Sequence, residues 1–262
     1  GDLARALGDL YVRRAKGTVA YFDRLLIETT GLADPAPILH SLMQDPLLAA
    51  RFRLDGVVTT VDAVHGAGQL DAQPESVKQA AVADRLVLTK SDLAPPEAIA
   101  ALRARLRALN PAAPIIAARD GAVDPGELLN AGLWDAARKT ADVRRWLKAE
   151  AYDAHEGHDH GAHDHGPEHG PHDARIRAFS LTHDREIDWA SLRDFLEALS
   201  ALCGARLLRL KALVNLRGEE RPLVLHGVGT LFHPPVLLES WPDADRRSRL
   251  AEVGACAQPG PS

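Results

Sequence analysis

This sequence contains little of the chemistry typical of secreted, membrane-bound or nucleic-acid-binding proteins. Its two cysteines, Cys203 and Cys256, form at most one pair, which is too few for a disulfide framework. A net charge of -5 leaves no basic excess to neutralise phosphates. No apolar run approaches the roughly 20 residues of a membrane span, and no signal peptide is visible. We therefore expect a cytoplasmic protein with no membrane and no nucleic-acid partner.

Methionine is also scarce, because Met43 is the only one and the chain begins with Gly1. Apolar residues such as Leu3, Leu7 and Leu10 share one face of a helix predicted over residues 2–16. A helix already in progress at the first residue indicates a cut within a larger protein. At the other end, residues 251–262 show no period and end in proline and glycine, which predicts a disordered tail.

Short apolar runs alternate with helical patterns over residues 1–150. The predicted strands cover residues 22–28, 54–61, 84–88 and 114–117. The predicted helices between them begin at Pro35, Glu75 and Pro95. Strands separated by helices pair in parallel, which predicts an α/β fold with an open, doubly wound, mostly parallel sheet. Ligands of such sheets bind at the carboxyl ends of the strands.

The composition changes abruptly after residue 150, and residues 151–174 form a linker rich in histidine, glycine and proline. A smaller α+β domain is predicted over residues 175–250. Its expected strands cover residues 175–181, 208–214 and 222–228, with a helix capped by Asp188. This order predicts a small sheet covered by a helix on one side.

Seven of the 12 histidines lie in this linker. They are His155, His158, His160, His163, His165, His169 and His172. Neutral imidazoles bind Zn²⁺, Ni²⁺ and Co²⁺, and the acidic residues between them can share the coordination sphere. Their loose spacing favours a store of several ions over one rigid site. The alternative is a solvated spacer without a metal.

A carboxylate and a glycine end the first predicted strand. Glu28 can bind Mg²⁺ directly or through water, because Mg²⁺ prefers hard oxygen ligands. Three residues later, Gly31 can bring a backbone N–H close to a phosphate. The alternative is a plain strand followed by a turn.

A second polar group, Thr89-Lys90-Ser91-Asp92, ends the strand predicted over residues 84–88. The Asp92 carboxylate can accept hydrogen bonds from N1–H and the exocyclic amine of guanine, a pair that adenine cannot supply. The stem of Lys90 can lie along the base while its ammonium group orders the loop. A polar turn that caps the next helix is the alternative.

Order and spacing make the resemblance to a known family specific. Residues 28–35 (Glu-Thr-Thr-Gly-Leu-Ala-Asp-Pro) resemble the Glu-x-Thr-Gly-x-x-x-Pro signature of CobW-family GTPases. Residues 54–65 resemble the next strand of that family, and residues 83–92 resemble its guanine-recognition segment. The histidine-rich linker and the α+β domain follow in the family's usual order.

The resemblance implies a role for each site residue. Glu28 would be the acid near Mg²⁺, and Gly31 would sense the γ-phosphate of GTP. Guanine recognition would fall to Thr89, Lys90, Asp92 and Ala118. The family implies GTP hydrolysis coupled to delivery of Zn²⁺ or Co²⁺ to a client protein that requires the metal. The metal, the client and self-association as a homo-oligomer stay open.

Two family features are absent from these residues. The family begins with Gly-x-x-Gly-x-Gly-Lys-Thr, which cradles the phosphates, and it carries a Gly-Cys-x-Cys-Cys metal site; neither occurs here. We therefore expect a GTPase-like sheet without its first strands, and no nucleotide hydrolysis by this chain alone. The alternative function is a non-catalytic module that binds metal and docks partners. A nickel-delivery GTPase fits the residue 28–35 spacing less well.

Overall fold

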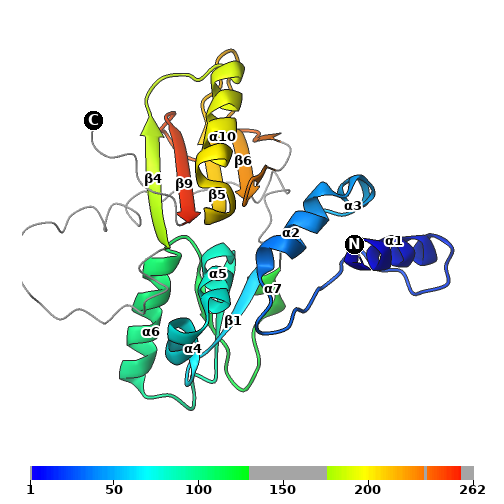
Figure 1. Cartoon of the computed structure of the whole chain (residues 1–262), viewed down its shortest axis with the longest axis vertical. Helices are drawn as coiled ribbons and strands as arrows, with labels where there is room; N and C mark the ends of the chain where they lie inside the picture. Colours follow the sequence, from blue (N-terminus) through cyan, green and yellow to red (C-terminus); the bar gives the residue numbers. More distant parts are fainter. Residues whose placement is uncertain (1, 130–175, 233–234, 255–262) are drawn as a thin grey trace, which may run out of the picture.

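The computed structural model describes residues 2–129, 176–232 and 235–254, which form two stacked units (Figure 1). The first unit combines helices with a three-stranded parallel sheet, and the second is a six-stranded antiparallel sheet with one long helix. Within these ranges, no helix is long and apolar enough to cross a membrane. The histidine-rich linker lies outside the described residues.

Three helices precede the parallel sheet: α1 (Asp2–Ala15), α2 (Pro35–Gln44) and α3 (Pro46–Arg51). The chain turns away from α1 at Gly17, whose φ of 68° is the left-handed conformation that glycine adopts without strain. The side chain of Asp34 caps α2 by accepting the Ala36 N–H at 3.0 Å. Both helix boundaries agree with the sequence prediction.

The parallel sheet has the order β1-β2-β3, and both of its pairings are parallel. Its strands are β1 (Val58–Asp62), β2 (Arg85–Thr89) and β3 (Ile115–Ala117). The associated helices are α4 (Gly66–Ala72), α5 (Pro74–Val82), α6 (Pro96–Leu109) and α7 (Pro125–Leu128). The predicted α/β arrangement of helices and parallel strands is therefore confirmed.

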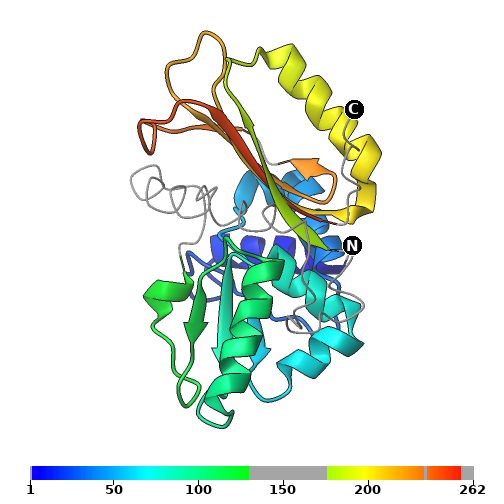
Figure 2. The ribbon, with the colours of Figure 1, turned by 90° about the vertical axis from the view of Figure 1, so that its left-hand side faces the viewer.

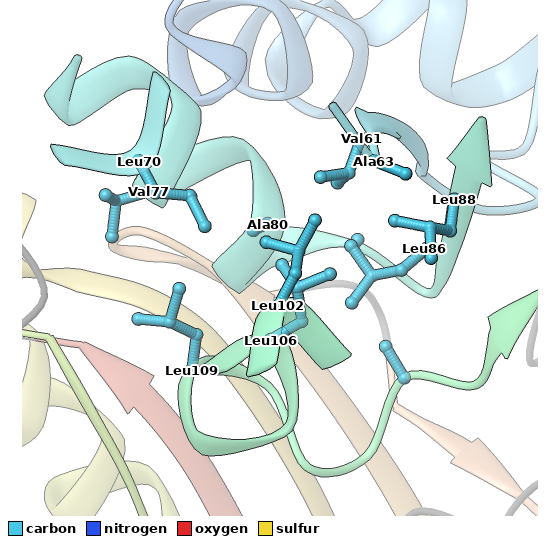
Figure 3. Packing of buried hydrophobic residues seen from close by; sticks show 12 residues of the cluster. Val61, Ala63, Leu70, Val77, Ala80, Leu86, Leu88, Leu102, Leu106 and Leu109 are labelled. Carbon is cyan, nitrogen blue, oxygen red and sulfur yellow. The ribbon is translucent and has the colours of Figure 1, made fainter. Parts of the chain in front are cut away.

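One apolar core joins this sheet to α5 and α6 (Figure 3). Leu86 and Leu88 of β2 are fully buried, as is Leu106 of α6. Leu102, Leu106 and Leu109 of α6 face this core together, because they recur at helical spacing. Hydrophobic burial of this kind is the main stabilising contribution in such a unit.

The strand predicted over residues 22–28 is wrong. These residues have no regular secondary structure, and Leu26 is 83% exposed while Ile27 is 40% exposed. A strand needs a hydrogen-bonded neighbour, and the described residues place none beside this segment. A short apolar run alone could not reveal that the neighbour was missing.

The second unit is an antiparallel sheet of order β4-β9-β5-β6-β7, with β8 also paired to β6. Its strands are β4 (Arg177–His183), β5 (Leu207–Val214), β6 (Leu223–Val228), β7 (Leu231–Phe232), β8 (Val236–Leu237) and β9 (Ser248–Gly254). Helix α10 (Trp189–Cys203) covers one face (Figure 2), as predicted for the smaller domain. Its last residue, Cys203, is buried and is not a free thiol.

Strand β9 corrects the prediction that the chain is a disordered tail from residue 251. It lies between β4 and β5, and residues 251–254 belong to it. Ala251, Glu252 and Val253 are all buried, so the strand lacks the alternation of apolar and polar residues that marks a half-exposed strand. The carboxylate of Glu252 in the middle of these residues also made a buried strand difficult to predict.

A buried ion cluster joins the two units. Asp84, which precedes β2, contacts Arg209 Nη2 at 2.6 Å and Lys211 Nζ at 3.0 Å through its Oδ1 atom. Its Oδ2 atom accepts the Val57 N–H at 3.0 Å, just before β1. Burial raises the pKa of Asp84, but the two cations outweigh burial and hold the pKa at about 2. The carboxylate is therefore charged and ties β1 and β2 to β5.

Candidate functional site

The carboxyl ends of the three parallel strands meet at one edge of the sheet. Asp62 at the end of β1 is in register with Thr89 at the end of β2, and Leu88 is in register with Ala117 at the end of β3. The residues that follow these strands are therefore neighbours. This edge is where ligands bind in open parallel sheets.

The loop after β2 is held in an unusual backbone conformation. Lys90 has a backbone φ angle of 56°, a value that residues other than glycine and asparagine rarely adopt. Its carbonyl accepts the Leu93 N–H at 3.0 Å, which closes the turn. Its Nζ atom donates to Asp62 Oδ2 at 2.6 Å, so the ammonium group is fixed beside the end of β1.

Asp62 follows the strand predicted over residues 54–61 and is a functional candidate to which the sequence assigned no role. Its Oδ1 atom accepts the N–H groups of Val64 at 2.8 Å and His65 at 3.1 Å, at the start of α4. Burial by itself would raise the pKa of the Asp62 carboxyl. The hydrogen bonds from Lys90 and from these two N–H groups outweigh burial, so the pKa lies below its usual value. The sequence signal for a functional role was that Asp62 ends the strand that pairs with the one before Lys90.

Ala118, whose role in guanine recognition is implied by the family resemblance, lies against the same loop. It is 2% exposed, and its N–H donates to Leu88 O at 2.9 Å. Ser91 Oγ donates to Ala118 O at 3.2 Å, which joins the loop after β2 to the end of β3. Thr89 Oγ1 donates to Val61 O at 3.3 Å, whereas Asp92 is exposed. The structure thus brings together Thr89, Lys90 and Ala118, with Asp92 open to solvent.

Residues 28–35 take a different form. Glu28 is exposed, and Gly31 lies in a turn closed by the Ala33 N–H to Thr30 O bond of 3.0 Å. A Cβ atom added at Gly31 would meet nothing within 4 Å, so contacts within the chain do not require glycine here. Among the described residues, no hydrogen bond or ion pair joins Glu28 or Gly31 to residues 89–92.

Helix α5 anchors this turn. Gln79 Nε2 donates to Gly31 O at 3.1 Å and to Ala33 O at 2.7 Å. Lys78 Nζ donates to Asp34 Oδ2 at 2.7 Å. Burial by itself would raise the pKa of Asp34. The hydrogen bonds from Lys78 and the Ala36 N–H outweigh burial, so the pKa lies below its usual value. The second half of the segment is therefore positioned by α5, not by a sheet.

The metal-binding prediction falls on residues that the structure does not describe. All seven linker histidines lie between residues 130 and 175. Within the described ranges, no group of three or more histidine, cysteine, aspartate or glutamate side chains could hold a metal ion.

Two known families match the two units of this chain. Residues 1–117 match the family described as CobW/HypB/UreG, nucleotide-binding domain. Residues 176–257 match the one described as Cobalamin synthesis protein cobW C-terminal domain. The matched segments correspond closely to the parallel-sheet unit and the antiparallel-sheet unit.

Several curated proteins are similar in sequence. The zinc chaperone YjiA of Escherichia coli (strain K12) is 30% identical over 253 residues, which are 97% of this chain and 72% of YjiA. The zinc chaperone CobW of Pseudomonas aeruginosa is 30% identical over 88% of this chain and 62% of its own length. The zinc-regulated GTPase metalloprotein activator 1 of Schizosaccharomyces pombe is 35% identical over 43% of this chain and 27% of its own length.

The likeness extends to three dimensions. A crystal structure of the Zn(II)-bound YjiA GTPase from E. coli matches with a TM-score of 0.72 at 30% identity. The match covers 97% of this chain and 72% of that one, so it includes both units. The chain therefore spans 72% of YjiA and under two thirds of the other two relatives.

Proposed function

This chain belongs to the CobW family, and on that premise we propose that it handles zinc under the control of a bound guanine nucleotide. Similar proteins are named as zinc chaperones and as a GTPase metalloprotein activator. The proposed cargo is Zn²⁺ or Co²⁺, and the proposed recipient is a client protein that requires the metal.

The loop after β2 is the observation that carries the nucleotide part of the proposal. Lys90 is fixed by Asp62 at 2.6 Å, while the next residues bond to the end of β3 and leave Asp92 exposed at the carboxyl edge of the sheet. The Asp92 carboxylate can accept N1–H and the exocyclic amine of guanine together. Adenine lacks that pair of donors, so the arrangement selects guanine.

The phosphate part of a nucleotide fits these residues less well. Glu28 offers an exposed carboxylate suited to Mg²⁺, but no stretch of the sequence reads Gly-x-x-Gly-x-Gly-Lys-Thr. That loop supplies charge-assisted hydrogen bonds worth about 1.5–3 kcal/mol each. We therefore expect these 262 residues alone to bind GTP weakly and not to hydrolyse it measurably.

Nucleotide selectivity tests the proposal directly. Saturation-transfer NMR with the purified chain should detect GTP, with a dissociation constant on the order of 1 mM, and should detect ATP more weakly. Asp92→Asn should weaken GTP and favour xanthosine triphosphate, because the amide donates where xanthine offers a carbonyl. Asp9→Asn removes an exposed carboxylate from α1 and should change neither nucleotide. Equal signals for GTP and ATP would reject guanine recognition by Asp92. The same conclusion would follow if Asp92→Asn kept the nucleotide affinities of the unmodified chain.

Zinc uptake tests the metal part. We expect the histidines of residues 155–172 to bind more than one Zn²⁺ per chain without nucleotide, as measured by calorimetry. Binding should weaken between about pH 7 and pH 5, because imidazole must be neutral to ligate and ordinarily titrates near pH 6.5. A variant with all seven histidines changed to serine is the control. Equal uptake by both proteins would place the metal elsewhere.

A non-catalytic module that binds metal and docks partners is the second candidate. This candidate needs no phosphate cradle, and these 262 residues hold no stretch of the form Gly-x-x-Gly-x-Gly-Lys-Thr. It predicts undiminished zinc uptake with no guanine preference at millimolar nucleotide. The same two measurements therefore separate the candidates.

A further inference from the structure

Helix α5 contacts both units and the Gly31 turn. Its Val77 and Ala80 side chains lie in the core of the parallel-sheet unit. At its end, Ala81 and Val82 pack with Leu208 and other residues of the antiparallel-sheet unit. Figure 1 and Figure 2 show the helix beneath the antiparallel sheet, at the junction of the units.

The carboxyl end of α5 is clamped by side chains from three elements. The last carbonyls of a helix have no partner within it and need outside donors. Thr59 Oγ1 of β1 donates to Gln79 O at 2.8 Å. Asn110 Nδ2, after α6, donates to Ala80 O at 2.9 Å and to Ala81 O at 3.1 Å.

The third clamp comes from the other unit. Arg209 Nη1 of β5 donates to Val82 O at 3.1 Å, while its Nη2 contacts Asp84 Oδ1 at 2.6 Å. One planar guanidinium group therefore joins β5 to the end of α5 and to the residue before β2. Because these groups are buried, a shift of β5 relative to α5 would strand polar atoms.

Two further side chains of α5, Lys78 and Gln79, position the Gly31 turn. The Gln79 amide reaches Gly31 O and Ala33 O, and Lys78 reaches Asp34. Asp34 in turn caps α2, which lies against α5, β6 and β7. The turn thus depends on α5 for its place.

We propose that α5 couples the turn at residues 31–34 to the antiparallel sheet, with Gln79 and Arg209 as positioning residues at its two contacts. If the proposed function holds, a nucleotide-dependent change at this turn would reach the second unit through α5. Coupling of this kind is reciprocal, so a change at Arg209 must be felt at the turn.

Hydrogen exchange tests the coupling without nucleotide. The probes are the Ala33 N–H, bonded to Thr30 O, and the Ala36 N–H, bonded to Asp34. In Arg209→Met, rapid-labelling exchange of the peptide covering residues 28–36 should be about twofold to tenfold faster than in the unmodified chain. Arg209→Lys is the second variant, for use if Arg209→Met folds poorly. It should change exchange in the same direction, since one ammonium group cannot replace the two donors that the guanidinium group directs to Val82 O and Asp84.

Arg105→Met is the matched control. Arg105 is also a buried arginine, bonded to Asp71 at 2.9 Å and to Ala67 O at 3.0 Å in α4, away from the end of α5. Urea brings the variants to equal global stability before exchange is compared. The control should leave residues 28–36 unchanged.

The reverse arm uses Gln79→Met, which should speed exchange in residues 207–214 of β5. Arg209→Met matching Arg105→Met at residues 28–36, or Gln79→Met leaving β5 unchanged, would overturn the proposal. Neither outcome bears on guanine binding, because no nucleotide is present. Failure to bind guanine would likewise leave the coupling intact.

Discussion

Two regions of this molecule each bury a carboxylate, and they treat it in opposite ways. At the junction of the units, Asp84 meets Arg209, Lys211 and the Val57 N–H. Inside the antiparallel-sheet unit, Glu252 of β9 is fully buried, and neither of its oxygens finds a donor among the described residues. The pKa of Asp84 is held at about 2, whereas burial raises the pKa of Glu252 to about 7.

The difference shows that desolvation sets the same direction in both regions and that nearby charge decides the outcome. Burial raises the pKa of either group. Only the junction supplies cations, so Asp84 stays charged there and holds two units together. Glu252 has no such partner among the described residues, so burial keeps its carboxyl protonated up to about pH 7.

Removal of the junction carboxylate should have the largest effect. In Asp84→Asn, Arg209 and Lys211 stay buried without an anion, and we expect a loss of about 3–5 kcal/mol in the free energy of unfolding. Urea denaturation measures it. The control is Asp71→Asn, whose half-exposed carboxylate pairs with Arg105 and should cost under about 1 kcal/mol. Equal losses would mean that burial of the cluster adds nothing.

The pH dependence of Glu252 should be the next largest effect. Its folded pKa of about 7 exceeds the unfolded value of 4.5, so the folded state holds a proton that the unfolded state releases. Stability should therefore fall by about 3 kcal/mol as pH rises from 4.5 to 7, and level off above. Glu252→Gln should lack this slope in denaturation curves recorded at each pH. An unchanged slope in that variant would assign the effect to other groups.

Acid should act in the opposite sense at the junction. The folded pKa of Asp84, about 2, lies below the unfolded value of 3.8, so the folded state binds a proton less readily. We expect a loss of about 2 kcal/mol as pH falls from about 4 to 2. Comparison of acid denaturation with that of Asp84→Asn isolates this contribution. Identical acid limbs would contradict it.

The partly exposed pair between Lys78 and Asp34 should give the smallest effect. Both side chains are about one third exposed, so solvent screens their contact of 2.7 Å. Lys78→Met should cost under about 1 kcal/mol in thermal denaturation, even though it faces the candidate site. A loss comparable to that of Asp84→Asn would show that solvent exposure does not weaken this ion pair relative to the buried cluster at the junction.

Prediction from sequence succeeded where local pattern and tertiary structure agree. A helix was predicted to begin at Pro95, and α6 spans Pro96–Leu109. The Asp188 cap was predicted correctly, because capping depends on groups within a few residues. The resemblance to the CobW family grouped Lys90 with Ala118, and the structure places the loop after β2 against the end of β3.

Failure came where distant partners decide. The segment 22–28 has the composition of a strand but no neighbour, and β9 has the neighbours but not the pattern. Asp62 received no role, since nothing local indicates that it binds Lys90 across two strands. The roles of Glu28, Gly31, Thr89 and Asp92, and of the seven linker histidines, stay predictions.

The sequence by itself determined the family and the parallel order of strands and helices, because these depend on local pattern and spacing. Only the tertiary structure decided that Arg209 and Lys211 neutralise Asp84, that no donor in the described part of the chain reaches Glu252, and that Gln79 holds the turn at Gly31. The physical reason is that the free energy of a buried polar group depends on which donors and charges surround it, and folding brings those from positions more than 100 residues away.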